Sequence, residues 1–263
     1  MPDSRLDAAL AARGLAKSRT TAARLIADGL VSVDGVGVVK ASARVADSQV
    51  IEVASSDHYV SRAAHKLIAG LDAFDVPVAG VLALDVGAST GGFTQVLLER
   101  GAGRVIALDV GHAQLHPLVR SDARVAVVEG FNARAMTADS LAAASRVAEI
   151  PAVVVADLSF ISLPTVLPAL VDTVGTGAQF VVLVKPQFEV GRTGIKEGIV
   201  KSAPARAEAV MGVLWAAWDL GLPTAGIIAS PIVGTSGNHE YVAWLGATGT
   251  NPGEWMDRVS EIA

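Results

Sequence analysis

The fold is decided by the stretch Ala83-Leu84-Asp85-Val86-Gly87-Ala88-Ser89-Thr90-Gly91-Gly92-Phe93, in which an apolar strand passes into a glycine-rich turn and a helix start. Glycine adopts backbone conformations that a β-carbon forbids, so the chain can pass close to a ligand at such a turn. In an open α/β sheet, ligands bind beside turns of this kind, at the carboxyl ends of the strands. The stretch therefore predicts a ligand site above residues 87–92.

Alternating apolar strands and helices continue outward from this turn. We expect strands at 81–86, 104–109, 125–128, 152–156, 178–184, 225–229 and 240–245, with helices at 92–100, 164–173 and 203–220. This alternation favours an α/β, Rossmann-like sheet that is mostly parallel and has helices on both faces. Only a short loop separates the last two strands, which predicts that they pair antiparallel at one end of the sheet.

A smaller unit precedes this sheet. Residues 4–30 have the apolar spacing of two short helices, and short strands follow at 30–33, 38–39 and 49–53, with a turn at Asp34-Gly35. We expect a small α+β domain over residues 1–56. Residues 57–66 then form a linker and the start of the large domain, which continues over 67–263.

Composition excludes several classes of protein. Of 263 residues, 51% are apolar and 18% are charged, which argues against general disorder. Apolar stretches such as 81–84 and 180–184 are far shorter than the roughly 18 residues that span a bilayer. The first residues lack the basic and apolar segments of an export signal, so we expect a cytoplasmic protein without stable membrane association. The absence of cysteine excludes disulfides, thiolate zinc sites and iron–sulfur clusters.

Charge is distributed unevenly along the chain. Residues 1–66 hold nine Lys and Arg against seven Asp and Glu, whereas residues 67–263 hold twelve against nineteen. A slightly basic small domain beside an acidic large one is consistent with a division of roles, in which the small domain contacts a polyanion and the large domain carries out the chemistry. Ordinary variation in composition explains the difference equally well.

The glycine-rich turn has its own ligand preference. Its glycines, 87, 91 and 92, match neither the phosphate loop nor the dinucleotide-binding pattern. Asp85 and Gly87 at the strand end suit a ligand with an amino group and no pyrophosphate. Asp109 ends the next strand 24 residues later, where a carboxylate accepts hydrogen bonds from ribose hydroxyls. Together these features predict a site for S-adenosylmethionine.

Further charged residues stand at strand ends. Asp157 and Lys185 follow two central strands, so their side chains should meet beside the glycines. Lys185 directly follows an apolar run, where an unpaired charge is costly, so an ion pair that only stabilises the sheet is one alternative. The other is a lysine placed to deprotonate a hydroxyl. Lys66 and Glu240 are more distant candidates, and the histidines have no spacing that suggests a metal site.

These segments together resemble the TlyA family of ribosomal RNA 2′-O-methyltransferases, some members of which are called hemolysins. The matching blocks run in one order along nearly the whole chain: Arg5-Leu6-Asp7, Arg13-Gly14-Leu15-Ala16-Lys17-Ser18-Arg19, Val60-Ser61-Arg62-Ala63-Ala64-His65-Lys66-Leu67, Gly87-Ala88-Ser89-Thr90-Gly91-Gly92-Phe93-Thr94, Ala156-Asp157-Leu158-Ser159-Phe160-Ile161-Ser162-Leu163, Lys185-Pro186-Gln187-Phe188-Glu189 and Ser236-Gly237-Asn238-His239-Glu240-Tyr241. The resemblance implies an S4-type RNA-binding domain followed by an FtsJ/RrmJ-like class I methyltransferase domain.

The resemblance also implies roles for individual residues. The catalytic tetrad would be Lys66, Asp157, Lys185 and Glu240. The cofactor contacts would fall on Asp85, Gly87, Ser89, Gly91, Asp109 and Asn132. The family linker often carries an Arg-x-Trp-Val element, whereas this chain has Asp57-His58-Tyr59-Val60. The missing arginine and the tyrosine in place of tryptophan leave any role of the linker open.

Ribosomal RNA, free or in a ribosomal subunit, is the implied partner, and no metal is implied because the leaving group is a neutral thioether. We expect Lys185 to remove or polarise the 2′-hydroxyl proton, with Lys66 stabilising the developing oxyanion. Since the large domain is acidic, RNA contact is expected at Arg5, Arg13, Lys17, Arg19, Arg24 and Arg62. The alternatives are a membrane-active hemolysin and an RNA-binding assembly factor without catalysis; retention of all four tetrad positions argues against the second.

Overall fold

Continuous apolar runs form the middle strands of the large sheet, because helices cover both of its faces. A computed structural model describes residues 4–27, 29–53, 58–191, 198–234 and 237–263. In this part of the chain the large sheet has the order β11-β12-β10-β9-β6-β7-β8. The strands are β6 (Leu82–Val86), β7 (Arg104–Asp109), β8 (Val125–Glu129), β9 (Val153–Ala156), β10 (Gln179–Val184), β11 (Thr224–Ala229) and β12 (Tyr241–Leu245). The predicted α/β sheet is confirmed.

The sheet reverses its strand order beside the glycine-rich turn. The chain runs from β6 outward through β7 and β8, and then returns to place β9 on the other side of β6. Strands β8, β7, β6, β9 and β10 are parallel. The reversal between β6 and β9 opens a crevice at the carboxyl ends of these strands, which is where such sheets bind ligands.

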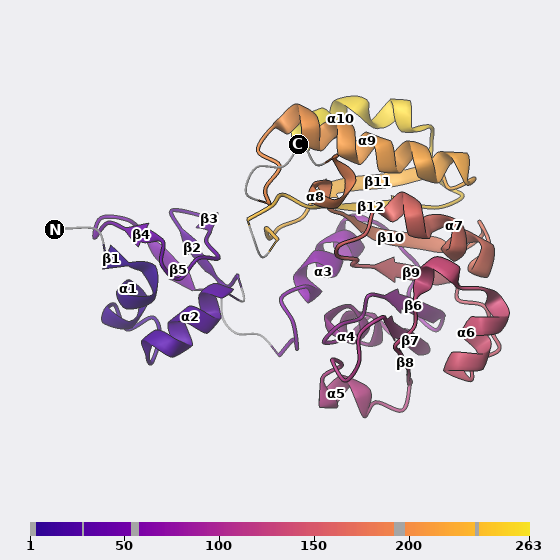
Figure 1. Ribbon diagram of the computed structural model, residues 1–263, viewed down its shortest axis with the longest axis horizontal. Coiled ribbons are helices and arrows are strands. Elements are labelled where there is room, and N and C mark those ends of the chain that lie inside the picture. Colours follow the sequence, from indigo (N-terminus) through magenta and orange to yellow (C-terminus); the bar gives the residue numbers. More distant parts are fainter. Residues whose placement is uncertain (1–3, 28, 54–57, 192–197, 235–236) are drawn as a thin grey trace.

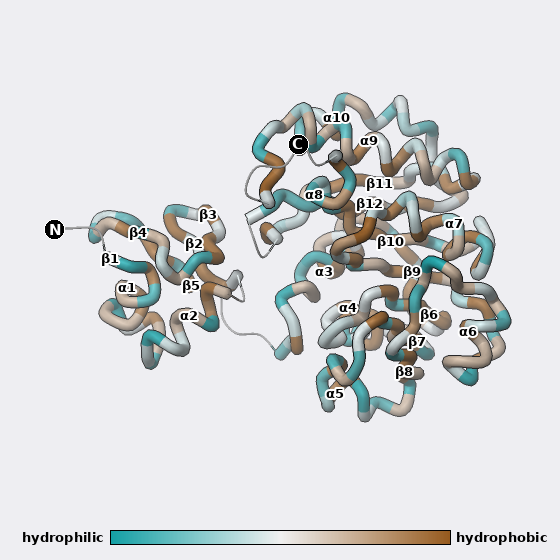
Figure 2. Tube along the Cα trace, viewed as in Figure 1, coloured by the Kyte–Doolittle hydropathy of each residue, from teal (hydrophilic) through white to brown (hydrophobic). Residues whose placement is uncertain are grey.

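The two faces of the sheet have separate helix layers (Figure 1). On one face lie α3 (Ala64–Ala73) and α4 (Gly92–Glu99), and on the other lie α6 (Ala138–Ser145), α7 (Leu163–Val174), α9 (Ala203–Asp219) and α10 (Met256–Ile262). Short helical turns are α5 (Pro117–Arg120), η1 (Ala133–Ala135), α8 (Pro186–Glu189) and η3 (Pro252–Trp255). Figure 2 shows the strands as mainly hydrophobic, in agreement with their burial. Each fully buried aliphatic side chain contributes about 1.5–3 kcal/mol to folding.

The small domain contains β1 (Ser4–Arg5), α1 (Leu6–Ala12), α2 (Arg19–Ala27), β2 (Val31–Val33), β3 (Val36–Gly37), β4 (Arg44–Val45) and β5 (Ile51–Val53). The predicted strand at 38–39 was misplaced. Asp34 and Gly35 both have positive φ, 51° and 79°. Such a two-residue turn reverses the chain tightly, so the returning strand begins at once with Val36. The pairing of β1 with β4 had no sequence signal.

Two expectations concern the segment between the domains. The predicted boundary at 56/57 lies outside the described residues. The segment 57–66, predicted to be a linker and the start of the large domain, contains the beginning of α3 at Ala64. Among the described residues, no helix is both long and apolar enough to cross a membrane.

Candidate active site

A cavity of about 690 Å³ opens where β6, β9 and β10 end. Its lining includes the four charged residues of the predicted tetrad: Lys66, Asp157, Lys185 and Glu240. Lys66 lies in the first turn of α3, whereas Asp157 and Lys185 directly follow β9 and β10. The ends of these parallel strands meet at one edge of the sheet, so the two side chains converge there, as the sequence predicted.

Glu240 reaches the same edge for a different reason. It immediately precedes β12, which runs antiparallel to β10, and Tyr241 pairs with Val184. The first residue of β12 therefore lies beside the last residue of β10. An antiparallel strand inserted between β10 and β11 is what brings a carboxylate from late in the chain to Lys66.

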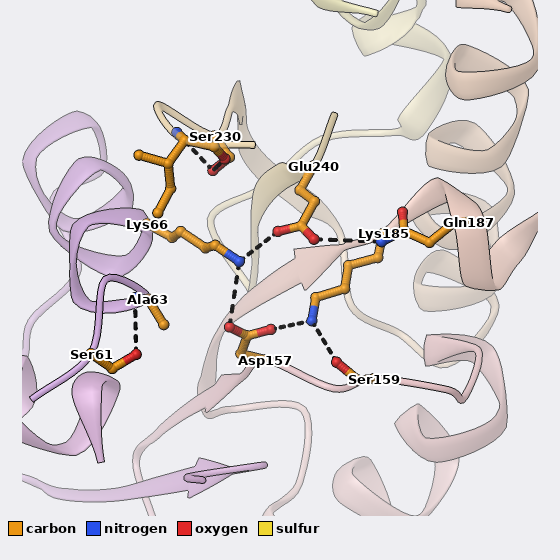
Figure 3. A network of polar contacts seen from close by, with 10 residues as sticks. Ser61, Ala63, Lys66, Asp157, Ser159, Lys185, Gln187, Ser230 and Glu240 are labelled. Carbon is orange, nitrogen blue, oxygen red and sulfur yellow. Dashed lines mark hydrogen bonds and ion pairs between the residues drawn. The ribbon is translucent and has the colours of Figure 1, made fainter. Parts of the chain in front are cut away.

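Asp157 lies between the two lysines (Figure 3). Its Oδ1 is 2.5 Å from Lys185 Nζ, and its Oδ2 is 3.7 Å from Lys66 Nζ. Lys66 Nζ also donates a hydrogen bond of 2.6 Å to Glu240 Oε2. Lys66, Lys185 and Glu240 are at most 7% exposed, which is tolerable because two lysines balance two carboxylates. The ion pair between Lys185 and Asp157 thus exists, but it lies in the wall of a cavity within a larger network.

Sequence reasoning missed several side chains of this cavity. Lys185 Nζ donates to Ser159 Oγ at 2.9 Å, and Gln187 Nε2 is 3.5 Å from Glu240 Oε1. Phe160 is 93% exposed, has a positive φ of 63°, and its ring centroid lies 5.3 Å from that of Phe188. These residues lie in the same short motifs as Asp157 and Lys185, and this was the only sequence signal that could have assigned them to the site.

A second cavity, of about 530 Å³, adjoins the first. Of the predicted cofactor residues, it is lined by Gly87, Ser89, Asp109 and Asn132. Its apolar lining includes Val110, Phe131, Leu158 and Ile161. A cavity with apolar walls and a carboxylate at its rim has the chemistry that a nucleoside requires.

The glycine-rich turn is held close to its neighbours. A β-carbon on Gly87 would lie 2.8 Å from the carbonyl oxygen of Asp157. Asp109 accepts hydrogen bonds from the backbone N–H of Ser89 at 2.8 Å and of Gly111 at 2.7 Å. The Asp109 carboxylate therefore fixes the turn as well as facing the second cavity.

Two predicted cofactor residues, Asp85 and Gly91, line neither cavity. Asp85 is fully buried and accepts a 2.6 Å hydrogen bond from Thr94 Oγ1 at the start of α4. Burial raises the pKa of Asp85 to about 7. A β-carbon on Gly91 would lie 2.8 Å from Leu115. The structure thus places both residues beneath or behind the turn, where they support its shape.

The predicted RNA-binding arginines at the chain start also have internal contacts. Arg5 and Arg19 both donate to the buried carboxylate of Asp7, and the hydrogen bond from Arg5 is the main reason why the pKa of Asp7 lies well below its usual range. Arg13 donates to the backbone carbonyls of residues 46, 47 and 49. Each of these arginines therefore stabilises the small domain, whatever else it contacts.

The remaining predicted RNA-binding residues are Lys17, Arg24 and Arg62. Lys17 and Arg24 are exposed. Arg24 and Arg62 line a polar cavity of about 570 Å³ between α2 and the segment before α3. Arg62 also lines the cavity of the four charged residues, so the two cavities share a wall.

The segment before α3 contacts α4 through His58, Tyr59 and Val60, and of these three Tyr59 alone departs from the family pattern. His58 Nε2 lies 2.6 Å from Glu99 Oε1, and the Tyr59 hydroxyl donates to Glu99 Oε2 at 2.8 Å. The backbone N–H of Val60 donates to Gln95 Oε1. Asp57 lies outside the described residues. Gln95 Nε2 also donates to the carbonyl oxygen of His58, so several hydrogen bonds connect the described part of the linker to the helix that starts at the glycine-rich turn.

Comparison with known proteins agrees with this arrangement. The pattern of FtsJ-like methyltransferases matches residues 59–247, and that of S4 domains matches residues 4–51. Among the described residues, no three His, Asp or Glu side chains form a cluster that could hold a metal ion.

Relatives match over almost their whole length. The 16S/23S rRNA (cytidine-2′-O)-methyltransferase TlyA of Mycobacterium tuberculosis is 49% identical over 92% of this chain and 89% of that protein. Hemolysin A of Brachyspira hyodysenteriae is 38% identical over 91% of this chain and 98% of its own. A solved structure of a protein from Streptococcus thermophilus, named as a hemolysin, is 35% identical, has a TM-score of 0.75, and matches 100% of this chain and 94% of that one. The chain therefore belongs to the TlyA family of ribosomal RNA 2′-O-methyltransferases, with an S4 domain joined to an FtsJ-like methyltransferase domain.

Proposed function

We propose that this protein transfers the methyl group of S-adenosylmethionine to the 2′-hydroxyl of a cytidine in ribosomal RNA. The observation that carries the proposal is the junction of two cavities, one holding the network of four charged side chains and one suited to a nucleoside. The specificity for cytidine rests on the name of the mycobacterial relative. Such a substrate places the activity in the cytoplasm.

The second cavity is the proposed cofactor site. When bound, S-adenosylmethionine supplies an electrophilic methyl group on a positively charged sulfur. Asp109 would accept hydrogen bonds from the ribose hydroxyls, and the backbone of Gly87 and Ser89 would approach the amino acid portion. Val110 and Phe131 offer apolar surfaces for the adenine, and Asn132 lies at the same wall.

The network of charged residues then prepares the nucleophile. A ribose 2′-hydroxyl is a weak nucleophile until its proton is lost. We assign Lys185 to accept this proton at Nζ, where Asp157 stabilises the ammonium group that results. Lys66, held by Glu240, would position the ribose and stabilise the negative charge developing on its 2′ oxygen.

RNA would reach this site along the small domain. We propose that residues 1–56 form an S4 domain that docks on phosphates, residues 57–66 a linker, and residues 67–263 the catalytic domain. Lys17 and Arg24, which are exposed, and Arg62, which lines the cavity beside α2, are candidates for phosphate contact. The exposed Phe160 ring, which lines both cavities, offers a stacking surface for an unpaired base.

Variants of Lys185 test this function. Lys185→Ala should lower the single-turnover rate of methyl transfer from labelled S-adenosylmethionine to ribosomal RNA by about 10²–10⁴-fold. Lys185→Arg should not restore the rate, because arginine does not lose its proton at working pH. Lys201→Ala, at an exposed lysine that lines neither cavity, is the matched control.

The opposite pattern would support a purely structural ion pair. In that case Lys185→Arg restores both the rate and the melting temperature, whereas Lys185→Ala lowers the melting temperature. Rapid methyl transfer by a folded Lys185→Ala variant would remove Lys185 from the mechanism. Mapping of 2′-O-methyl groups on ribosomal RNA, with and without the protein, identifies the nucleotide.

A further inference from the structure

Ser159 lies where the two cavities meet. Among the residues that the structure describes, those lining both cavities are Gly87, Ser89, Asp157, Ser159 and Phe160. Ser159 is exposed, and it is two residues from Asp157 on the loop that follows β9. Its hydroxyl oxygen accepts the 2.9 Å hydrogen bond from Lys185 Nζ.

Together, Asp157 and Ser159 constrain the Lys185 nitrogen. A lysine nitrogen has three positions around it besides its bond to carbon. Ser159 Oγ accepts a hydrogen bond at 2.9 Å and so occupies one of them, whereas Asp157 Oδ1, 2.5 Å away, forms an ion pair whose geometry is not that of a hydrogen bond. The hydrogen bond to Ser159 therefore restricts the rotation of Nζ about its terminal bond, while the ion pair with Asp157 holds the nitrogen at this edge of the cavity. Asp157 alone would leave the nitrogen free to rotate about its terminal bond.

The loop that carries Ser159 is itself anchored to the segment that carries Lys185. Four residues after Lys185, Glu189 accepts hydrogen bonds from Ser162 Oγ at 2.6 Å and from the backbone N–H of Leu163 at 2.9 Å. Between these anchors the Phe160 and Phe188 rings are in contact. Residues 157–163 and 185–189 thus contact each other at three successive points, which limits movement of Ser159 relative to Lys185.

We propose that Ser159 is a positioning residue, which orients Lys185 Nζ toward the substrate hydroxyl. The inference rests on the proposed function, because it assumes that Lys185 accepts the proton. Loss of the Ser159 hydroxyl would leave Lys185 paired with Asp157 but less well directed. The effect should therefore be partial, and it should concern the rate rather than binding.

The test compares Ser159→Ala, Ser159→Thr and the control Ser260→Ala, an exposed serine on α10 outside both cavities. For Ser159→Ala we expect kcat to fall roughly 10- to 100-fold, as for a lost hydrogen bond to a charged group. The KM for ribosomal RNA and the Kd for S-adenosylmethionine should each change less than about twofold. The melting temperature should change by no more than about a degree. Ser159→Thr keeps the hydroxyl and should recover most of the rate.

The outcomes separate this inference from the function on which it rests. If Lys185→Ala is inactive while Ser159→Ala keeps the wild-type kcat, the function stands and the positioning role is refuted. A fall in kcat that threonine does not rescue also refutes it, since the hydroxyl would then not be the cause. If Lys185→Ala itself remains active, the proposed function fails first.

Discussion

Replacing Asp85 by asparagine should make the protein more stable above neutral pH and change how its stability depends on pH. Asp85 is 0% exposed, and its Oδ1 has no hydrogen-bond partner among the described residues. Burial therefore disfavours the carboxylate and raises the pKa of Asp85 from 3.8 to about 7. Asparagine has the same shape, stays neutral, and can keep a hydrogen bond with Thr94.

The sign and size of the effect follow from this pKa. Because the folded pKa is the higher one, the folded state keeps a proton that the unfolded state has lost. The stability that this proton provides is present below about pH 4 and is lost as the pH rises through about 7. A tenfold change in proton concentration is worth about 1.4 kcal/mol, so the wild type loses roughly 2–3 kcal/mol between about pH 5 and pH 8 from Asp85 alone. The variant lacks this loss.

Urea unfolding of both proteins at these two pH values measures the difference. The free energy of unfolding of Asp85→Asn, relative to the wild type, should be about 2–3 kcal/mol higher at about pH 8 than at about pH 5. Any cost of packing the amide is the same at both pH values and cancels. Asp219→Asn, at an exposed carboxylate on α9, is the control. A relative stability that does not change with pH would refute the reasoning.

Two further predictions concern ligand binding. Asp109→Ala should weaken S-adenosylmethionine binding by about 1.5–3 kcal/mol, measured by calorimetry, because ribose acceptors are lost; unchanged affinity would contradict the assignment of the second cavity. Lys17→Ala combined with Arg24→Ala should weaken RNA binding and reduce the slope of log affinity against log salt by roughly 0.7–0.9 per lost contact. Arg19→Ala should in addition destabilise the small domain, because Asp7 loses a partner, and an unchanged melting temperature would argue against that structural role.

The sequence by itself determined the class of fold and the positions of most site residues along the chain. Strand and helix periods are local properties, and so is a glycine-rich turn after an apolar strand. They predicted the sheet and the convergence of Asp157 with Lys185, because parallel strands end at one edge. They did not predict the strand at Val36, because the tightness of a turn depends on backbone angles that residue types only suggest.

Only the tertiary structure decided which atoms of the site meet. The insertion of β12 between β10 and β11 is a matter of sheet order, and it brings Glu240 to Lys66 across the fold. The hydrogen bond from Lys185 to Ser159 depends on how two loops pack. The burial of Asp85 also depends on packing. Its place at a strand end predicted contact with the ligand, but the folded chain encloses its side chain beneath the turn. Spacing along a chain places residues at an edge, whereas contact and burial depend on everything that packs around them.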